Sequence, residues 1–187
     1  VSLAFVAVLF LNRLTIALSF IGLLLAIVYP FVKRVSHWPQ AFLGMAFGWG
    51  AVMSWSAATG TVGLVPVLIF VANVCYSIAY DTIYALMDMK DDLKIGVKST
   101  AIYFGDSVYS ALWVIYLLMT VILGAAGYLS GLGRFYFGGL ASGLIILLWI
   151  VSVLKKTPTR RTAFKGFIGN VIAGGIILAA IILDMNL

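Results

Sequence analysis

The sequence predicts an all-α membrane protein, a polytopic helical bundle with six complete transmembrane helices and part of another. Hydrophobic residues make up 64% of the 187 residues and charged residues only 10%, whereas a soluble domain is about half apolar and about a quarter charged. Six apolar stretches are long enough to cross a bilayer, which takes about 20 residues each. Because backbone groups in hydrocarbon need internal partners, we expect each stretch to be a helix.

The expected spans follow one another with short connections. They cover residues 15–31, 38–58, 64–88, 107–129, 135–154 and 163–183. The apolar run before them, Val1 to Leu11, is too short to cross a bilayer, so we expect it to be the tail of a helix. Proline lacks an N–H group and is tolerated best near helix ends. Prolines and glycines accordingly mark the predicted boundaries, at Pro30, Pro39, Pro66, Gly131, Gly133 and Pro158.

Basic residues gather in alternate connections, as six crossings require. One side carries ten, namely Lys33, Arg34, Lys90, Lys94, Lys98, Lys155, Lys156, Arg160, Arg161 and Lys165. The other side carries only Arg13 and Arg134. Since basic residues collect in cytoplasmic loops, the rich side is predicted to face the cytoplasm. This topology accounts for the net charge of +6 without a nucleic-acid partner.

Two smaller features concern packing. The single cysteine, Cys75, excludes an internal disulfide, and its apolar neighbourhood predicts that it packs among hydrophobic side chains. Pairs of glycines four residues apart predict close contacts between helices of the bundle, with dimerisation as the alternative. The pairs are Gly44/Gly48, Gly127/Gly131 and Gly139/Gly143. The oligomeric state stays open.

The chemistry-bearing feature is a stripe of aspartates at the end of the third span. All six acidic residues are aspartates, and four lie close together, at Asp81, Asp88, Asp91 and Asp92. Steps of three, four and seven residues place them with Tyr84 on one helical face. The stripe runs back through Ser77 and Asn73 into the membrane, where polar groups are costly and should face a protein cavity.

This stripe predicts a cation site in a cytoplasmic loop. Clustered carboxylates take up protons near neutral pH unless a cation lies between them. Ligands that are all oxygen favour Mg²⁺ or Ca²⁺ over Zn²⁺, and Mg²⁺ often shares its coordination shell with a substrate phosphate. Lys94 and Lys98 follow directly and are placed to hold more of such a phosphate's charge. The alternative is a solvated acidic helix end without a ligand.

Two blocks of the sequence resemble a known family. The segment Asp81-x-x-Tyr84-Ala85-x-x-Asp88-x-x-Asp91-Asp92, followed by Lys94-Ile95-Gly96-Val97-Lys98-Ser99-Thr100, closely resembles the second aspartate-rich motif of the UbiA intramembrane prenyltransferases. A second block looks like the branch of that family that prenylates 4-hydroxybenzoate. It consists of Tyr29-Pro30-Phe31-Val32-Lys33-Arg34, Trp38-Pro39-Gln40 and Leu43-Gly44-Met45-Ala46-Phe47-Gly48-Trp49.

The resemblance covers essentially all 187 residues and implies one transmembrane prenyltransferase domain, residues 1–187. The family fold has nine spans and a first metal motif of the Asn-Asp-x-x-Asp type, which does not occur in this sequence. We therefore expect the chain to be the C-terminal two-thirds of the enzyme, without the N-terminal helices and the first aspartate motif. Alone, it is expected to be inactive.

The activity that the resemblance implies is prenyl transfer at a bacterial inner membrane. A polyprenyl group passes from polyprenyl diphosphate to the ring of 4-hydroxybenzoate, ortho to the hydroxyl, as a step of ubiquinone biosynthesis. Mg²⁺ would bridge aspartates and diphosphate. Asp88 and Asp92 match the family's Asp-x-x-x-Asp spacing and are the first candidates for its ligands, while Asp81 and Asp91 would bind directly or through water.

The resemblance also assigns roles outside the aspartate stripe. Tyr29 and Lys33 match the family's Tyr-x-x-x-Lys element, which suggests that the Tyr29 ring stabilises an allylic cation and that Lys33 meets the diphosphate. Arg34 is the candidate for gripping the acceptor's carboxylate. Asn73 and Tyr84 are expected to line the cavity. The plainer alternatives are charges that set topology for Lys33 and Arg34, and hydrogen bonds between helices for Asn73 and Tyr84.

Three other functions remain open at this point. A transporter with an acidic cation site would show helices broken near the middle of the membrane, and no such break is evident. A relative acting on another acceptor, such as a naphthoate or a haem, fits the aspartates but not the block from Tyr29 to Trp49. A scaffold would have no need of the aspartate stripe. The lone histidine, His37, lies beside Trp38 and is expected to anchor the chain at the membrane interface.

Overall fold

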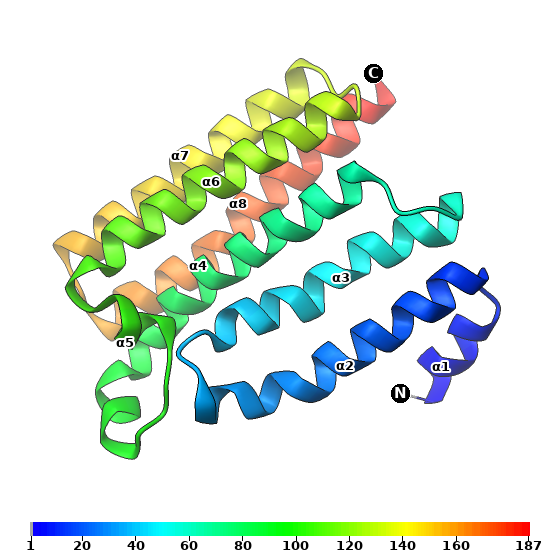
Figure 1. Cartoon of the computed structure of the whole chain (residues 1–187). Helices are drawn as coiled ribbons and strands as arrows, with labels where there is room; N and C mark the ends of the chain where they lie inside the picture. The colour runs from blue at the N-terminus through cyan, green and yellow to red at the C-terminus, as the bar shows by residue number, and fades with distance from the viewer. Residues whose placement is uncertain (1) are drawn as a thin grey trace.

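The computed structural model describes residues 2–187, with the side chains of residues 6–32, 34–89 and 91–187. This part of the chain is helical throughout and contains no strand (Figure 1). Its elements are α1 (Ser2–Leu9), α2 (Arg13–Val35), α3 (Pro39–Thr59), α4 (Leu64–Ile95), α5 (Thr100–Phe104), the 3₁₀ turn η1 (Gly105–Ser107), α6 (Val108–Leu129), α7 (Arg134–Lys156) and α8 (Arg160–Asn186). Six segments of the described chain are long and apolar enough to cross a membrane. The predicted fold class and number of spans are confirmed.

The structure adds helical turns to two of the predicted spans. The span predicted at 64–88 does leave the apolar region at Met89, but α4 continues to Ile95 before the left-handed Gly96 ends it, at φ 73°. The aspartate segment is therefore not a loop but the last turns of a helix. The second difference is α5, which begins at Thr100 ahead of the span predicted at 107–129. Ser99 caps α5 by accepting a hydrogen bond from the Ile102 N–H.

The long helices form two groups joined by α4. In Figure 1, α2, α3 and α4 lie side by side, and α6, α7 and α8 pack as a second group beyond α4. Helix α4 contacts α3 on one side and both α6 and α8 on the other. The hydrophobic core lies in the second group, around Ile83 of α4, Leu112 and Tyr116 of α6, and Leu147 of α7. The helix with the aspartates is thus fixed on two sides.

Glycines let several helices approach closely. A Cβ atom at Gly44 of α3 would lie 2.8 Å from the Ser77 Cβ of α4, and one at Gly139 of α7 would lie 2.1 Å from the Ala180 Cβ of α8. Both glycines therefore serve packing within the bundle, as the sequence predicted. Gly131 differs, because its φ of 73° places it in the turn after α6.

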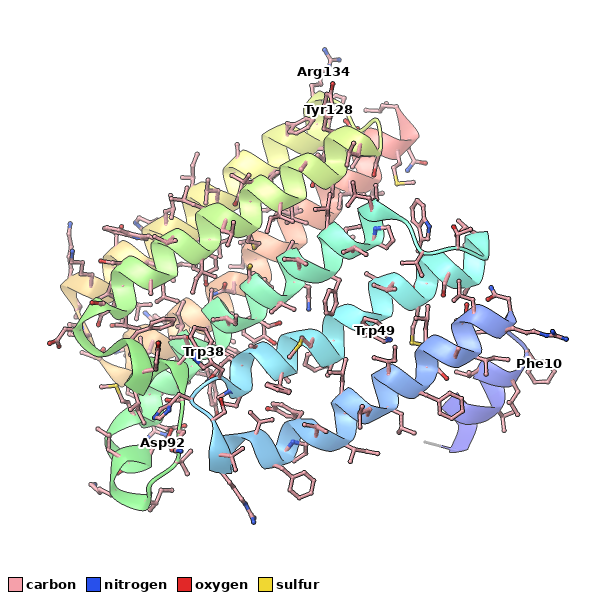
Figure 2. The ribbon with its side chains drawn as sticks, viewed as in Figure 1. Phe10, Trp38, Trp49, Asp92, Tyr128 and Arg134 are labelled. Carbon is pink, nitrogen blue, oxygen red and sulfur yellow. The ribbon has the colours of Figure 1, made fainter. Side chains whose placement is uncertain are left out.

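The two ends of the bundle differ in charge. The α2–α3, α4–α5 and α7–α8 connections meet at one end, and the other three meet at the opposite end (Figure 1). Trp38 and Asp92 lie at the first end, and Phe10, Tyr128 and Arg134 at the second (Figure 2). We call the first the basic end, because the sequence places ten of the twelve basic residues in or beside its connections.

Candidate functional site

The four clustered aspartates all lie on the last part of α4, with Asp81 and Asp88 inside its apolar span and Asp91 and Asp92 on the turns that extend beyond it at the basic end. At 3.6 residues per turn, Asp81, Asp88 and Asp92 fall on nearly the same face, while Asp91 is rotated away by about a quarter-turn. From Asp81 to Asp92 the helix rises about 16 Å. One continuous helix therefore carries carboxylates from inside the membrane to beyond its surface.

Asp88 is paired with a residue that the sequence did not single out. Its Oδ1 accepts a hydrogen bond from Nη2 of Arg160 at 3.3 Å, and 38% of the Asp88 side chain is exposed. Arg160 is the first residue of α8, 72 positions further along the chain. The α7–α8 connection thus brings a guanidinium onto the aspartate face, a contact that no local pattern encodes.

Asp91 makes a local ion pair instead. Its Oδ1 lies 2.8 Å from Nζ of Lys94, and both side chains are largely exposed. An exposed pair three residues apart on a helix contributes only a few tenths of a kcal/mol. Lys94 therefore lies on the Asp91 side of α4, but so weak a pair leaves its long side chain free to reach a diphosphate on the neighbouring face.

The polar stripe continues down α4 into the span. Asn73 donates a hydrogen bond to the Gly44 carbonyl of α3 at 3.0 Å, and it also borders a cavity of ≈ 180 Å³. Tyr84 is exposed and packs edge-on against Phe167 of α8, with the ring centroids 5.3 Å apart. The two expectations for Asn73 are thus compatible, since the side chain both links two helices and borders a cavity.

The candidate residues on α2 lie near the end of that helix. Tyr29 is half-buried and lies close enough to Tyr80 of α4 to interact with it electrostatically. Arg34 is exposed. The side chain of Lys33 lies outside the described part of the structure. Of the two α2 candidates whose side chains are described, Tyr29 is the one with an interaction to α4, through Tyr80.

Hydrogen bonds tie the segment after α4 to the neighbouring helices. Nζ of Lys98 donates to the Val35 carbonyl at the end of α2, at 3.2 Å. The buried Gln40 side chain accepts a hydrogen bond from the Thr100 N–H at 3.3 Å, and the Thr100 hydroxyl contacts the Thr82 hydroxyl of α4 at 2.5 Å. Gln40, Thr82 and Thr100 were not predicted as site residues, and they fix the base of the aspartate segment.

Two cavities open on either side of Arg160. One, of ≈ 570 Å³, is lined by Tyr84, Met87, Asp88, Arg160, Arg161 and Phe164. The other, of ≈ 470 Å³, borders Asp91 and Lys94 and extends to Tyr109 of α6. Both fall within the range of small-ligand sites. Acidic and basic side chains share each cavity. A ligand that combines a cation, for the carboxylates, with an anion, for the basic groups, therefore suits these cavities better than either ion alone.

The described carboxylates on α4 are too few at any one point for a closed metal site, but they are enough for Mg²⁺. No group of three or more His, Cys, Asp or Glu side chains converges on a point among the described residues. Mg²⁺, however, commonly takes only one or two carboxylates and completes its shell with water and substrate phosphate oxygens. Asp88 and Asp92, one turn apart on an exposed helix end, match that requirement. A closed site for Zn²⁺ needs four ligands.

Comparison with known sequences links this arrangement to one family. Residues 1–171 match the sequence model of the UbiA prenyltransferase family. Proteins named 4-hydroxybenzoate octaprenyltransferase are 42% identical over 184 residues in Alkalilimnicola ehrlichii, 42% over 178 in Marinobacter nauticus and 43% over 180 in Nitrosococcus oceani. The alignments cover 98%, 95% and 96% of this chain but 62%, 60% and 63% of those relatives. The chain thus spans about three-fifths of the length of these curated relatives.

Two solved structures share the fold. A digeranylgeranylglyceryl phosphate synthase superposes with a TM-score of 0.74 at 22% identity, over 96% of this chain and 64% of its own. A UbiA homologue from Aeropyrum pernix K1, solved without ligand, gives a TM-score of 0.74 at 24% identity, over 97% of this chain and 68% of its own. At these identities the likeness concerns the helical architecture.

Proposed function

The chain belongs to the UbiA prenyltransferase family, and we propose that it acts in the transfer of a polyprenyl group from polyprenyl diphosphate to the ring of 4-hydroxybenzoate. One observation carries the proposal: relatives named for this acceptor are 41–43% identical over nearly the whole chain. The aspartate face on α4 supports it, because a diphosphate needs a cation-binding site at the membrane surface. The product, prenylated ortho to the hydroxyl, would enter ubiquinone biosynthesis.

The aspartates would bind the donor's headgroup through Mg²⁺. Asp88 and Asp92 are the proposed ligands, and Asp81 and Asp91 would assist directly or through water. When bound, Mg²⁺ neutralises charge on the leaving diphosphate as the allylic C–O bond breaks. Lys94 and Lys98, with Lys33 from α2, would bind the remaining charge of the diphosphate.

The reacting carbon of the donor and the acceptor would lie beside α4, between its aspartate face and the end of α2. Loss of diphosphate leaves an allylic cation, which a half-buried aromatic ring such as that of Tyr29 stabilises. The ring carbon of 4-hydroxybenzoate then forms the new C–C bond and loses its proton, which restores aromaticity. Arg34 would hold the acceptor's carboxylate, because a guanidinium binds that group through two parallel hydrogen bonds. Asn73 and Tyr84 would line the cavity.

The proposed setting is a bacterial inner membrane with the basic end in the cytoplasm. The excess of Lys and Arg at that end supports this orientation. The diphosphate would approach the aspartates from the cytoplasmic side, while the long isoprenoid chain stays in the bilayer. A water-soluble acceptor and a lipid-soluble donor would thus meet at the membrane boundary.

The test is an assay of the complete protein with Mg²⁺, polyprenyl diphosphates of different lengths and a panel of acceptors that includes 4-hydroxybenzoate and a naphthoate. We expect 3-polyprenyl-4-hydroxybenzoate to form only when Mg²⁺ is present. Transfer to another acceptor alone would overturn the proposed substrate but keep the reaction class. Ion uptake by reconstituted protein without any prenyl transfer would overturn both.

A further inference from the structure

A groove between α7 and α8 shares one lining residue, Phe164, with the cavity that contains Asp88, but its other walls are different. It measures ≈ 550 Å³ and is lined mainly by apolar side chains, among them Trp149 of α7 and Ile168 and Ile172 of α8. These three side chains are 66%, 45% and 59% exposed. They belong to membrane-spanning segments, so in a bilayer the groove opens toward lipid.

The groove owes its depth to glycines. Gly166 and Gly169 of α8 line it and carry no side chain to fill it. A Cβ at Gly169 would lie 2.7 Å from the Cδ1 of Ile150 on α7, so a glycine here permits the close approach of the two helices. The result is a slot between helices, bounded by side chains that project on both sides.

Apart from Phe164, the α8 side chains that line the slot do not border the cavity of the proposed prenyl-transfer site. Phe167 of α8 packs on Tyr80 and Tyr84 of α4, with centroid distances of 5.9 and 5.3 Å. Lys165 is two residues from Phe167 and therefore lies about 200° around the helix from it. Most of an occupant of the slot would thus lie across α8 from the aspartate face, with Phe164 as the wall common to both cavities, which favours a bilayer lipid over the prenyl donor.

One end of the slot is positively charged. Lys165 and Thr162 line it where α8 begins, at the basic end. Lys165 is exposed and forms no ion pair among the described side chains. The sequence has five basic residues from 155 to 165 and no acidic residue between Asp106 and Asp184. An anionic group at the membrane surface would meet no repulsion there from this part of the chain.

We propose that the α7–α8 groove binds an anionic phospholipid, with an acyl chain along Trp149 and Ile172 and the phosphate beside Lys165 and Thr162. Pockets between transmembrane helices with basic residues at the cytoplasmic side suit such headgroups. The distance fits as well, because the seven residues from Lys165 to Ile172 span about 10 Å of helix, from the headgroup region into the hydrocarbon.

The test is a titration of the full-length protein in a non-ionic detergent, followed by thermal unfolding. Phosphatidylglycerol should raise the unfolding midpoint at lower concentrations than phosphatidylcholine, and glycerol phosphate, which has no acyl chains, should leave it unchanged. Lys165→Ala should weaken the apparent affinity for phosphatidylglycerol about fivefold, the factor given by roughly 1 kcal/mol per basic residue. Lys156→Ala is the matched control, because it removes the same charge near the same connection but outside the groove.

Three results would overturn the proposal. Equal effects of the two phospholipids would mean that the protein has only a general need for apolar surroundings. Equal losses in the Lys165→Ala and Lys156→Ala variants would mean a diffuse attraction to anionic lipid without a site. No effect of either lipid would mean that the groove stays empty or is covered by protein. None of these measurements involves prenyl transfer, so the outcome is independent of the proposed function.

Discussion

At the scale of single residues, Asp88 is the aspartate whose environment is best defined. It lies on the face of α4 that also carries Asp81 and Asp92, and it shares a cavity with two arginines. If it binds Mg²⁺ and diphosphate, removing its carboxylate removes charge stabilisation at the leaving group, an effect of about a hundredfold or more. We therefore predict that Asp88→Ala lowers the prenyl-transfer rate of the complete protein by at least this factor with an unchanged unfolding temperature. Asp106→Ala, in the exposed turn before α6, is the control, and full activity of Asp88→Ala would remove Asp88 from the mechanism.

Arg160 competes with any cation for Asp88, since the two form an ion pair at 3.3 Å. Such an exposed pair is worth about 1 kcal/mol or less, equivalent to a factor of up to about five in binding. We predict that Arg160→Ala lowers the Mg²⁺ concentration needed for half-maximal activity by a few-fold. Arg161→Ala, in the same cavity but without an ion pair to the described aspartates, should change it little. A raised Mg²⁺ requirement in Arg160→Ala would show that Arg160 binds the diphosphate instead.

The aspartate face could be predicted from the sequence because it depends only on the spacing of residues along one helix. Residues three, four and seven apart share a helix face wherever that helix packs, and the Asp91–Lys94 pair follows from the same spacing. The contacts that were missed join distant parts of the chain. Arg160 meets Asp88 across 72 positions, and Gln40 meets Thr100 across 60. These contacts depend on how the helices pack, which a single sequence does not specify.

At the scale of helices, glycines decide how closely α7 and α8 pack. A methyl group at Gly139 would lie 2.1 Å from the Ala180 Cβ, whereas one at Gly138 would meet nothing within 4 Å. Overpacking of this kind costs about 1–3 kcal/mol. We predict that Gly139→Ala lowers the unfolding temperature by several degrees and that Gly138→Ala, which gains helix propensity, does not. Equal midpoints for the two variants would mean that the helices separate without cost.

The start of α7 is capped by a residue near the end of α8. Asp184 of α8 accepts hydrogen bonds from the N–H groups of Gly133, Phe135 and Tyr136, with distances of 2.5, 3.1 and 3.3 Å. A carboxylate there satisfies free N–H groups and complements the helix dipole. We predict that Asp184→Ala lowers the free energy of unfolding. Asp184→Asn, which keeps one acceptor oxygen, should lose less, and a variant as stable as the parent would contradict the capping role.

Helix positions were predictable to the extent that hydrophobicity defines them. The apolar part of α4 ends at Met89, one residue beyond the predicted boundary, but hydropathy gives no sign that the helix itself continues. The extension to Ile95 depends on the terminating Gly96 and on polar residues whose pairs stabilise an exposed helix end. The short helix α5 was missed for a related reason, since its start depends on the Ser99 cap.

At the scale of the whole molecule, the bundle lacks a feature expected of many transporters. Transporter sites often use helices that unwind near the middle of the membrane. Here α4 runs without interruption from Leu64 to Ile95, and α2 continues through Pro30. Several interior polar groups bond to other helices, as where Tyr76 and Tyr116 both donate to Asn170 of α8 at 2.7 Å. Unbroken helices in the described chain, with most basic residues at one end, suit a reaction at the membrane surface better than alternating access.

The charge difference between the two ends of the bundle predicts its orientation in the membrane. Ten basic residues on one side and two on the other give a strong bias toward a cytoplasmic basic end. We predict that, in a Cys75→Ala background, a membrane-impermeant maleimide labels Ser130→Cys in intact spheroplasts, whereas Thr157→Cys is labelled only after lysis. Both positions lie in exposed connections and neither substitution changes a charge. The reverse pattern would place the aspartates outside the cell, away from a cytoplasmic supply of diphosphate substrate, and labelling of both would mean that the chain inserts in two orientations.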